Sequence, residues 1–118
     1  MDGITVYGIP NCDVTRKCTN WLRENNIEFS FHDYKVKGIS KTKLADWCTR
    51  KGLEYILNKR GTTWKNLPEA EKEKITDQPS AINLMAANTS LIKRPVIEVK
   101  GKLLVGFNEN EFLTNIKK

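Results

Sequence analysis

The sequence has 118 residues, the length of one ordinary domain, and its hydrophobic content of 39% is enough for a core without disulfide bonds. The net charge of +6 comes from 20 basic and 14 acidic residues scattered without a recognition motif, so we expect a solvated basic surface rather than nucleic-acid binding. The sequence has an odd number of cysteines, three, and no signal-peptide pattern at its N-terminus, so we expect a cytoplasmic protein with free thiols. It has no apolar run of roughly 18 residues, so we expect no membrane span.

The first third of the chain predicts a strand, a helix and a second strand. Residues 4–7 have the pattern of a short buried strand, and a turn at Pro10 and Asn11 follows, with Asn11 as the expected helix cap. A helix is predicted from about residue 12 to 24. Its apolar residues share one face: Val14, Cys18, Trp21 and Leu22. Residues 28–34 alternate as a second strand, so the two strands should be parallel.

The middle of the chain, about residues 38–90, predicts a helical insertion. One helix face carries Leu44, Trp47 and Cys48. This helix should end at Gly52, residues 58–64 break the periodicity as a loop, and Pro68 and Pro79 should each open a further helix. No stretch has the composition of a linker, so we expect residues 1–118 to form a single domain that contains the insertion.

Two strands and a helix should complete the fold. Residues 95–99 and 103–107 flank Lys100-Gly101-Lys102, which is the pattern of a β-hairpin. Asn108 is placed to cap a last helix. The apolar face of this helix would carry Phe112, Leu113 and Ile116. The element order is therefore β-α-β, helical insertion, β-β-α, which is an α/β fold.

Cys12 carries the strongest chemical signal. It follows a predicted strand and opens a predicted helix, where unpaired backbone N–H groups and the helix dipole favour negative charge. A thiol there ionises more easily, and the thiolate is the nucleophile. Thr15 can donate a hydrogen bond and Arg16 adds a positive charge, whereas the carboxylate of Asp13 opposes ionisation. We therefore expect Cys12 to be reactive.

The other cysteines and the histidine have structural interpretations. Cys18 lies on the predicted core stripe, about 240° around and about 9 Å along the helix from Cys12, so the two cannot form a disulfide without unwinding the helix. Cys48 shares a helix face with Leu44, and whether it can resolve an intermediate on Cys12 is left open. His32, the one histidine, is expected to be a partly exposed strand residue. No cluster has metal-ligand spacing, so we predict no metal.

Two segments carry a family resemblance. The run from Asn11 to Arg16, Asn-Cys-Asp-Val-Thr-Arg, resembles the Cys-x-x-[Ser/Thr]-Arg loop of the arsenate reductase (ArsC)/Spx family. Residues 91–95, Leu-Ile-Lys-Arg-Pro, resemble that family's Leu-Ile-x-Arg-Pro segment, and residues 58–64 with Gly106-Phe107 look most like its YffB-like branch. The resemblance covers nearly the whole chain. It implies a thioredoxin-like fold with the insertion between strands two and three and with Pro95 in the cis form.

The resemblance also implies site residues. In arsenate reductases of the family a cysteine attacks the oxyanion and three arginines hold it; Cys12, Arg60 and Arg94 match the cysteine and the first two arginines. Phe107 stands near the position of the third arginine, which counts against arsenate reduction. Thr15 stands where Spx-type regulators often carry a second cysteine, so a redox switch of that kind is unavailable.

The YffB-like branch implies a glutathione-dependent thiol reductase with one active cysteine. In this interpretation Cys12 is the nucleophile, and Thr15 with Arg16 stabilises its thiolate. Glutathione, the co-substrate, would be held by a second set of residues: Asn11, Arg60, Arg94 and Pro95. Two alternatives stay open, an arsenate reductase and a non-enzymatic Spx-like module that binds RNA polymerase. We expect a monomer.

Overall fold

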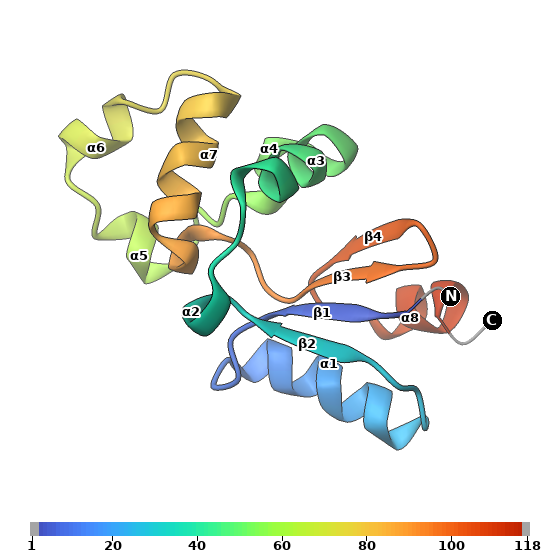
Figure 1. Ribbon diagram of the computed structural model, residues 1–118. Coiled ribbons are helices and arrows are strands. Elements are labelled where there is room, and N and C mark those ends of the chain that lie inside the picture. The colour runs from blue at the N-terminus through green and yellow to red at the C-terminus, as the bar shows by residue number, and fades with distance from the viewer. Residues whose placement is uncertain (1–2, 117–118) are drawn as a thin grey trace. The chain divides into compact units, whose positions relative to one another are not determined.

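The computed structural model describes residues 3–116 of the chain. The chain forms two compact units (Figure 1). The sheet unit comprises Met1–Lys37 and Arg94–Lys118, and the helical unit comprises Gly38–Lys93. Each unit is described by itself below.

The sheet unit contains one four-stranded sheet in the order β2-β1-β3-β4. Its strands are β1 (Thr5–Gly8), β2 (Ser30–Asp33), β3 (Val96–Val99) and β4 (Lys102–Val105). The central strand β1 runs parallel to β2 and antiparallel to β3, and β3 pairs antiparallel with β4. The predicted parallel strand pair and the predicted C-terminal hairpin are thus both confirmed.

Helices α1 (Asp13–Glu24) and α8 (Glu109–Asn115) pack on one face of this sheet (Figure 1). Val6, Ile97 and Leu104 lie in register across β1, β3 and β4, so their side chains point to the same face. They form the core with buried residues of the two helices, namely Cys18, Trp21, Leu22 and Phe112, and with Ile116 at the C-terminal end of α8. The burial of this apolar surface holds the helices to the sheet.

The buried face of α1 differs from the predicted one. Val14, expected in the core, is 40% exposed, whereas Thr15 and Thr19 are buried. Cys18 and Thr19 follow Thr15 by three and four residues, so the three side chains lie on the same face of the helix. Both threonines therefore belong to the buried stripe although they are polar. The helix cap is Cys12 rather than Asn11. The prediction counted only apolar residues and left out the threonines, so it misplaced the buried face of α1.

Two further expectations in the sheet unit were wrong. Tyr34, predicted to continue the second strand, instead begins the short helix α2 (Tyr34–Lys37) and is almost fully buried. The backbone N–H of Lys35 donates to Asp33 Oδ1 at 2.8 Å, which starts this turn directly after β2. Leu113, predicted to be buried, is 44% exposed, because α8 packs through Phe112 and Ile116.

The helical unit consists of short helices. They are α3 (Lys41–Lys51), α4 (Leu53–Ile56), α5 (Thr62–Lys65), α6 (Glu69–Glu73), α7 (Gln78–Ala87) and the 3₁₀ helix η1 (Thr89–Leu91). The two longest, α3 and α7, pack together. The predicted faces are confirmed, since Leu44, Trp47, Cys48, Ile82 and Met85 are buried. Part of the predicted loop 58–64 is helical, because α5 begins at Thr62.

Side-chain caps and one bridge fix the ends of these helices. Ser40 caps α3 by accepting from the Lys43 N–H at 3.1 Å. Asp77 caps α7 by accepting from the Ser80 N–H at 3.0 Å, and the Ser80 hydroxyl accepts in return from the Asp77 N–H at 3.2 Å. An isolated antiparallel β-bridge joins Leu57, just after α4, to Ile92, near the end of the helical unit.

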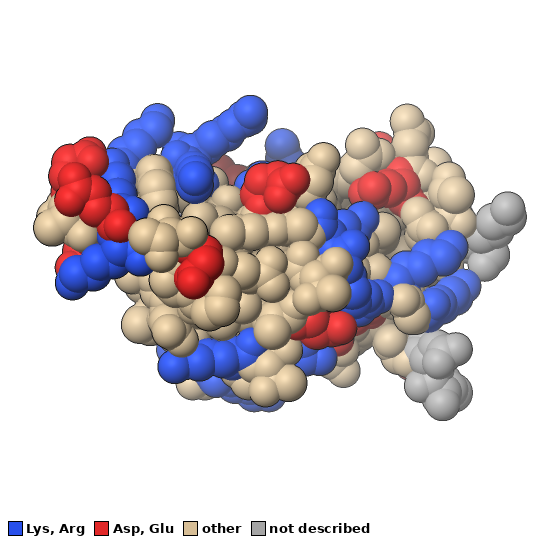
Figure 2. Space-filling model, turned by 90° about the horizontal axis from the view of Figure 1, so that it is seen from above, with Lys and Arg blue, Asp and Glu red and all other residues tan. Residues whose placement is uncertain are grey.

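Charge is distributed over the surface rather than gathered. On the face drawn in Figure 2, lysine and arginine side chains are interspersed with acidic and uncharged ones. The net charge of +6 therefore does not form one continuous basic patch on this face. Within residues 3–116, no helix is long and apolar enough to span a membrane.

Candidate active site

Cys12 occupies the N-cap position of α1. Its backbone is extended, with φ −92° and ψ 128°, and its carbonyl accepts the first helical hydrogen bond from the Arg16 N–H at 2.9 Å. The side chain of an N-cap residue normally accepts a hydrogen bond from the N–H groups of the first turn, and the Cys12 thiol makes no such bond. Because a thiolate is a far better acceptor than a thiol, ionisation of Cys12 would supply the missing cap.

The surroundings of the Cys12 sulfur favour its ionised form. Partial burial raises the pKa of the Cys12 thiol, but hydrogen bonds to the sulfur outweigh this effect and bring the pKa below its ordinary value. These bonds act on the ionised sulfur and come from the Thr15 side chain, the Thr15 N–H, the Arg94 side chain and the Val14 N–H. Two of the donors are thus backbone groups of the first helical turn. The donors around Cys12 therefore favour its thiolate form.

Thr15 is buried, with 1% of its surface exposed. Its Oγ1 has no hydrogen-bond partner among the described residues, and toward an ionised Cys12 sulfur this hydroxyl is a donor that lowers the pKa of Cys12. Burying a hydroxyl without a hydrogen-bond partner costs free energy. A role for the Thr15 hydroxyl as a donor to the Cys12 thiolate would explain why it is kept. Gly8 leaves room for it, because a Cβ atom at position 8 would lie 2.8 Å from Thr15 Oγ1.

Arg16, predicted to stabilise the thiolate, has an acidic partner of its own, and its role at the sulfur stays a prediction. Its guanidinium forms an ion pair with Asp13 one turn away, and both side chains are well exposed. The groups that lower the pKa of Cys12 are other ones. Pairing with Arg16 offsets the charge of Asp13, the carboxylate that would otherwise oppose the thiolate.

Arg94 and Pro95 enter the site from the start of β3. The Arg94–Pro95 peptide bond is cis, as the resemblance implied, and the Pro95 carbonyl accepts from the Gly106 N–H at 2.7 Å. The Arg94 side chain donates a hydrogen bond that lowers the pKa of Cys12. The structure thus brings Cys12, Thr15 and Arg94 into one site. Pro95 directly follows Arg94 in the chain, and Asn11 directly precedes Cys12.

Sequence analysis missed a buried tyrosine beside this site. Burial raises the pKa of Tyr34 strongly, with further contributions from Tyr7 and Glu98, while the charge of Arg94 acts in the opposite direction. The Tyr7 hydroxyl donates to Glu98 Oε1 at 2.7 Å, and the ring of His32 lies 4.9 Å from the ring of Tyr7. His32 is half-buried, as predicted. Nothing in the sequence indicated this role for Tyr34, because the alternation of polar and apolar residues over 28–34 predicted a strand and not the start of α2.

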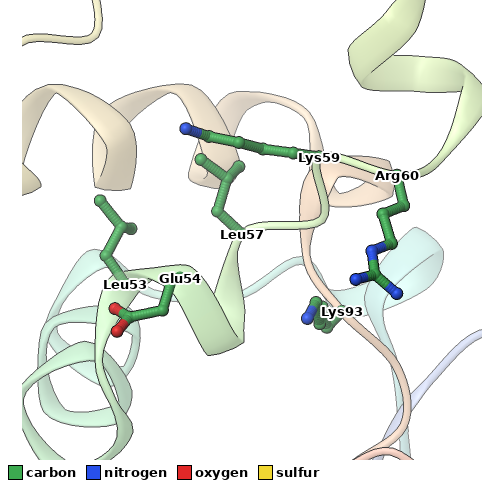
Figure 3. Close-up of a pocket in the computed structure, with 6 residues that line it drawn as sticks. All are labelled: Leu53, Glu54, Leu57, Lys59, Arg60 and Lys93. Atoms are coloured by element: carbon green, nitrogen blue, oxygen red, sulfur yellow. The ribbon is translucent and has the colours of Figure 1, made fainter.

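Arg60 belongs to the helical unit, where it lines a pocket of about 420 Å³. The lining residues are Leu53, Glu54, Leu57, Lys59, Arg60 and Lys93. In Figure 3 the Arg60 guanidinium and Lys93 lie on one side and the Glu54 carboxylate on the other. Lys59 Nζ lies 5.2 Å from the centre of the Trp64 ring. This pocket is therefore lined by three cationic side chains, one carboxylate and two leucines.

The remaining cysteines are structural in environment. Cys18 is fully buried and its burial raises the pKa of the thiol to about 12; Cys48 is 3% exposed and burial raises its pKa as well. Both were predicted to be buried, and this is confirmed. Among the described residues, no three His, Cys, Asp or Glu side chains are grouped so as to hold a metal ion.

We expect the three thiols to alkylate in the order set by these environments. At neutral pH iodoacetamide should modify Cys12 first, and the pH at which its rate is half-maximal should lie below the ordinary thiol pKa, since only the thiolate reacts. Cys18 and Cys48 should react only after the fold is opened with denaturant. Peptide mass spectrometry of samples quenched over time measures the order, and native modification of Cys18 before Cys12 would contradict it.

Comparison with known proteins places this geometry in a family. The profile of the ArsC family matches residues 7–115. The chain belongs to the ArsC family. A Haemophilus influenzae protein of uncharacterized function is 47% identical over 109 residues, covering 92% of this chain and 95% of the relative. The global transcriptional regulator Spx of Streptococcus pyogenes is 31% identical over 111 residues, covering 92% and 81%.

A solved structure agrees with the fold. A YffB protein superposes with a TM-score of 0.91 at 42% sequence identity, over 96% of this chain and 98% of that one. The predicted family and the predicted thioredoxin-like α/β fold are both confirmed.

Proposed function

We propose that this ArsC-family protein is a glutathione-dependent thiol–disulfide oxidoreductase that uses Cys12 as its only nucleophile. The observation that supports the proposal is the Cys12 sulfur at the N-cap of α1, surrounded by donors that lower its pKa. A thiolate is the attacking form in disulfide exchange, and donors that stabilise it also make it a better leaving group. The same donors therefore serve both halves of the reaction.

In the proposed reaction the Cys12 thiolate attacks the glutathione sulfur of a mixed disulfide. A bond forms between the two sulfurs, the original disulfide breaks, and the released thiolate takes a proton from water. A second glutathione, as its thiolate, then attacks the glutathione sulfur bound to Cys12. Glutathione disulfide leaves and the Cys12 thiolate is regenerated. Overall, the mixed disulfide and one free glutathione give the substrate thiol and glutathione disulfide, whose second half is the glutathione taken from the substrate.

An external thiol is needed in this scheme because the chain has no accessible second thiol. Cys18 and Cys48 are buried, and burial raises the pKa of each. Thr15 stands where a second cysteine of a Cys-x-x-Cys pair would be. We propose that Arg94, Pro95, Asn11 and Arg60 hold the carboxylates and backbone of glutathione, and that the protein works as a monomer in the reducing cytoplasm.

Two other functions remain candidates within the family. Arsenate reduction would use the same cysteine, but Phe107 packs 5.0 Å from the ring of Phe112 and 6.5 Å from that of Trp21, so an aromatic contact stands where the third arginine was expected. The likeness to the global transcriptional regulator Spx supports a non-enzymatic regulatory module. The family resemblance implies RNA polymerase as its partner. Stable retention of RNA polymerase, together with full biological activity of Cys12→Ser, would favour that module over both enzymes.

The test of the proposed function is exchange with glutathione disulfide. The reduced protein should gain one glutathione, mapped to Cys12 by peptide mass spectrometry, and lose it quickly when free glutathione is added. A chain with Cys48→Ala serves as the control and should be labelled in the same way, since its active thiol is intact. Slow labelling, or labelling spread over the three cysteines, would mean that Cys12 is not poised for disulfides, and arsenate and partner binding would be tested next.

A further inference from the structure

A second pocket lies along α1 in the sheet unit and adjoins the active site. Its volume is about 320 Å³. It is lined by Pro10, Thr15, Arg16, Thr19, Asn20, Arg23 and Phe31, and we call it the α1 pocket. It shares Thr15 with the cysteine site, and Pro10 lies two residues before Cys12. A ligand in this pocket would therefore begin beside the reactive sulfur and extend along the helix.

The polar groups of the α1 pocket suit an anionic ligand. Arg16, Asn20 and Arg23 are spaced by four and three residues, so they project from one face of α1. None of the described residues that line the pocket is acidic. The Arg23 guanidinium lies 5.4 Å from the centre of the Phe29 ring and has no acidic partner within residues 3–116. Pro10 and Phe31 add apolar walls.

Distance decides which part of a substrate could reach these arginines. Arg23 is eleven residues beyond Cys12, which is about 16 Å along the helix axis, and Arg16 is about 6 Å along it. An extended chain covers about 3.3 to 3.6 Å per residue, so an acidic side chain would need to lie about two to five residues from the cysteine under attack. Glutathione carries one residue on either side of its cysteine, so it could reach Arg16 but is too short to reach Arg23. The partner in the pocket is therefore the other half of the disulfide.

We propose that the α1 pocket binds an acidic peptide segment next to the cysteine of a protein–glutathione mixed disulfide. The proposal rests on the proposed function and names its substrate class. Cys12 bonds to the glutathione sulfur, the disulfide breaks, and the electron pair leaves on the peptide sulfur, which takes a proton from water. Glutamates or aspartates two to five residues from that sulfur pair with Arg23 and, in competition with Asp13, with Arg16 until the peptide departs.

The test uses three synthetic peptides that each carry one glutathionylated cysteine. They differ only two and four residues from the cysteine, where they hold glutamate, glutamine or lysine. Release of the peptide thiol is followed by mass spectrometry with free glutathione present. At low salt the acidic peptide should have a kcat/KM about threefold to fivefold above the neutral one, as expected for partly exposed ion pairs. The preference should disappear near 1 M salt, where charges are screened beyond about 3 Å.

Charge reversal assigns the preference to the pocket. Arg23→Glu should favour the lysine peptide over the glutamate peptide, whereas Lys17→Glu should keep the wild-type order. Lys17 is the matched control because it is exposed on the same helix and does not line the pocket. Circular dichroism checks that each variant folds, and the salt dependence of the wild type tests the proposal without any variant.

Three results would overturn the proposal. Equal rates on all three peptides would remove the α1 pocket from substrate selection and leave the thiol reductase standing. Reversal by Lys17→Glu as large as that by Arg23→Glu would mean that net charge, and not the pocket, sets the preference. No release from any peptide, with glutathione present, would count against the proposed function itself.

Discussion

Replacing Cys12 with serine is expected to abolish disulfide exchange and to make the fold more stable. Exchange with glutathione disulfide should fall to the uncatalysed background, because a serine hydroxyl does not ionise at neutral pH and forms no disulfide. Cys48→Ala, the matched control, should exchange at the wild-type rate per folded molecule. Residual exchange by Cys12→Ser above background would show that another thiol carries the reaction.

The gain in stability follows from the position of the cysteine in α1. The Cys12 thiol makes no cap hydrogen bond, whereas serine is among the preferred N-cap residues. Cys12→Ser should therefore raise the free energy of unfolding by about 0.5 to 1 kcal/mol in urea denaturation at pH 6. Cys12→Ala, which cannot cap, should show no gain. A cysteine kept where serine would be more stable is typical of a residue retained for chemistry.

The pH dependence of this difference has a definite sign. The pKa of the Cys12 thiol is lower in the folded chain than its ordinary value, so ionisation of Cys12 stabilises the fold. This contribution is absent at low pH, grows as the pH rises through the folded-state pKa, and is complete above the pKa of the unfolded chain. The advantage of Cys12→Ser over the wild type should shrink over that same rise. An advantage that is constant with pH would contradict the role of the thiolate as a cap.

The elements predicted correctly are those whose side chains repeat with a clear period. The parallel β1–β2 pair, the β3–β4 hairpin and the buried faces of α3 and α7 all follow from such repeats. α2 was missed because it has only four residues, and one turn is too short to show a helical period. Val14 was misplaced because threonines, which are polar, complete the buried stripe of α1. The expected single domain stays a prediction.

The candidate site was predicted in part, and its parts came from two sources. The position of Cys12 between a strand and a helix follows from local patterns, whereas Arg94 and Pro95 came from the family resemblance. The N–H of Val14 and the space at Gly8 were not identified, since a backbone donor and a missing side chain leave no trace in residue chemistry. A glycine that ends a strand just before a cysteine was the available signal for close packing of Thr15.

Thr15→Val is expected to lower the reactivity of Cys12 without weakening the fold. Valine has nearly the shape of threonine and lacks the hydroxyl that lowers the pKa of Cys12. Alkylation at neutral pH should slow by about threefold to tenfold, the size of one charge-assisted hydrogen bond reduced for a partly exposed sulfur. The pH at which alkylation is half-maximal should rise. An unchanged pH profile would remove Thr15 from the site.

The stability of the same variant separates function from packing. Thr15 Oγ1 is a buried atom with no hydrogen-bond partner within residues 3–116, so deleting it should leave the free energy of unfolding equal or raise it by about 1 kcal/mol at pH 6. Thr15→Ser is the matched control, because it keeps the hydroxyl and removes a buried methyl group. It should keep the pH profile of Cys12 and lose about 1 kcal/mol of stability. If Thr15 is a donor to the Cys12 thiolate, Thr15→Val should lose reactivity but not stability, and Thr15→Ser should lose stability but not reactivity. A threonine with a purely structural role would not produce this pair of results.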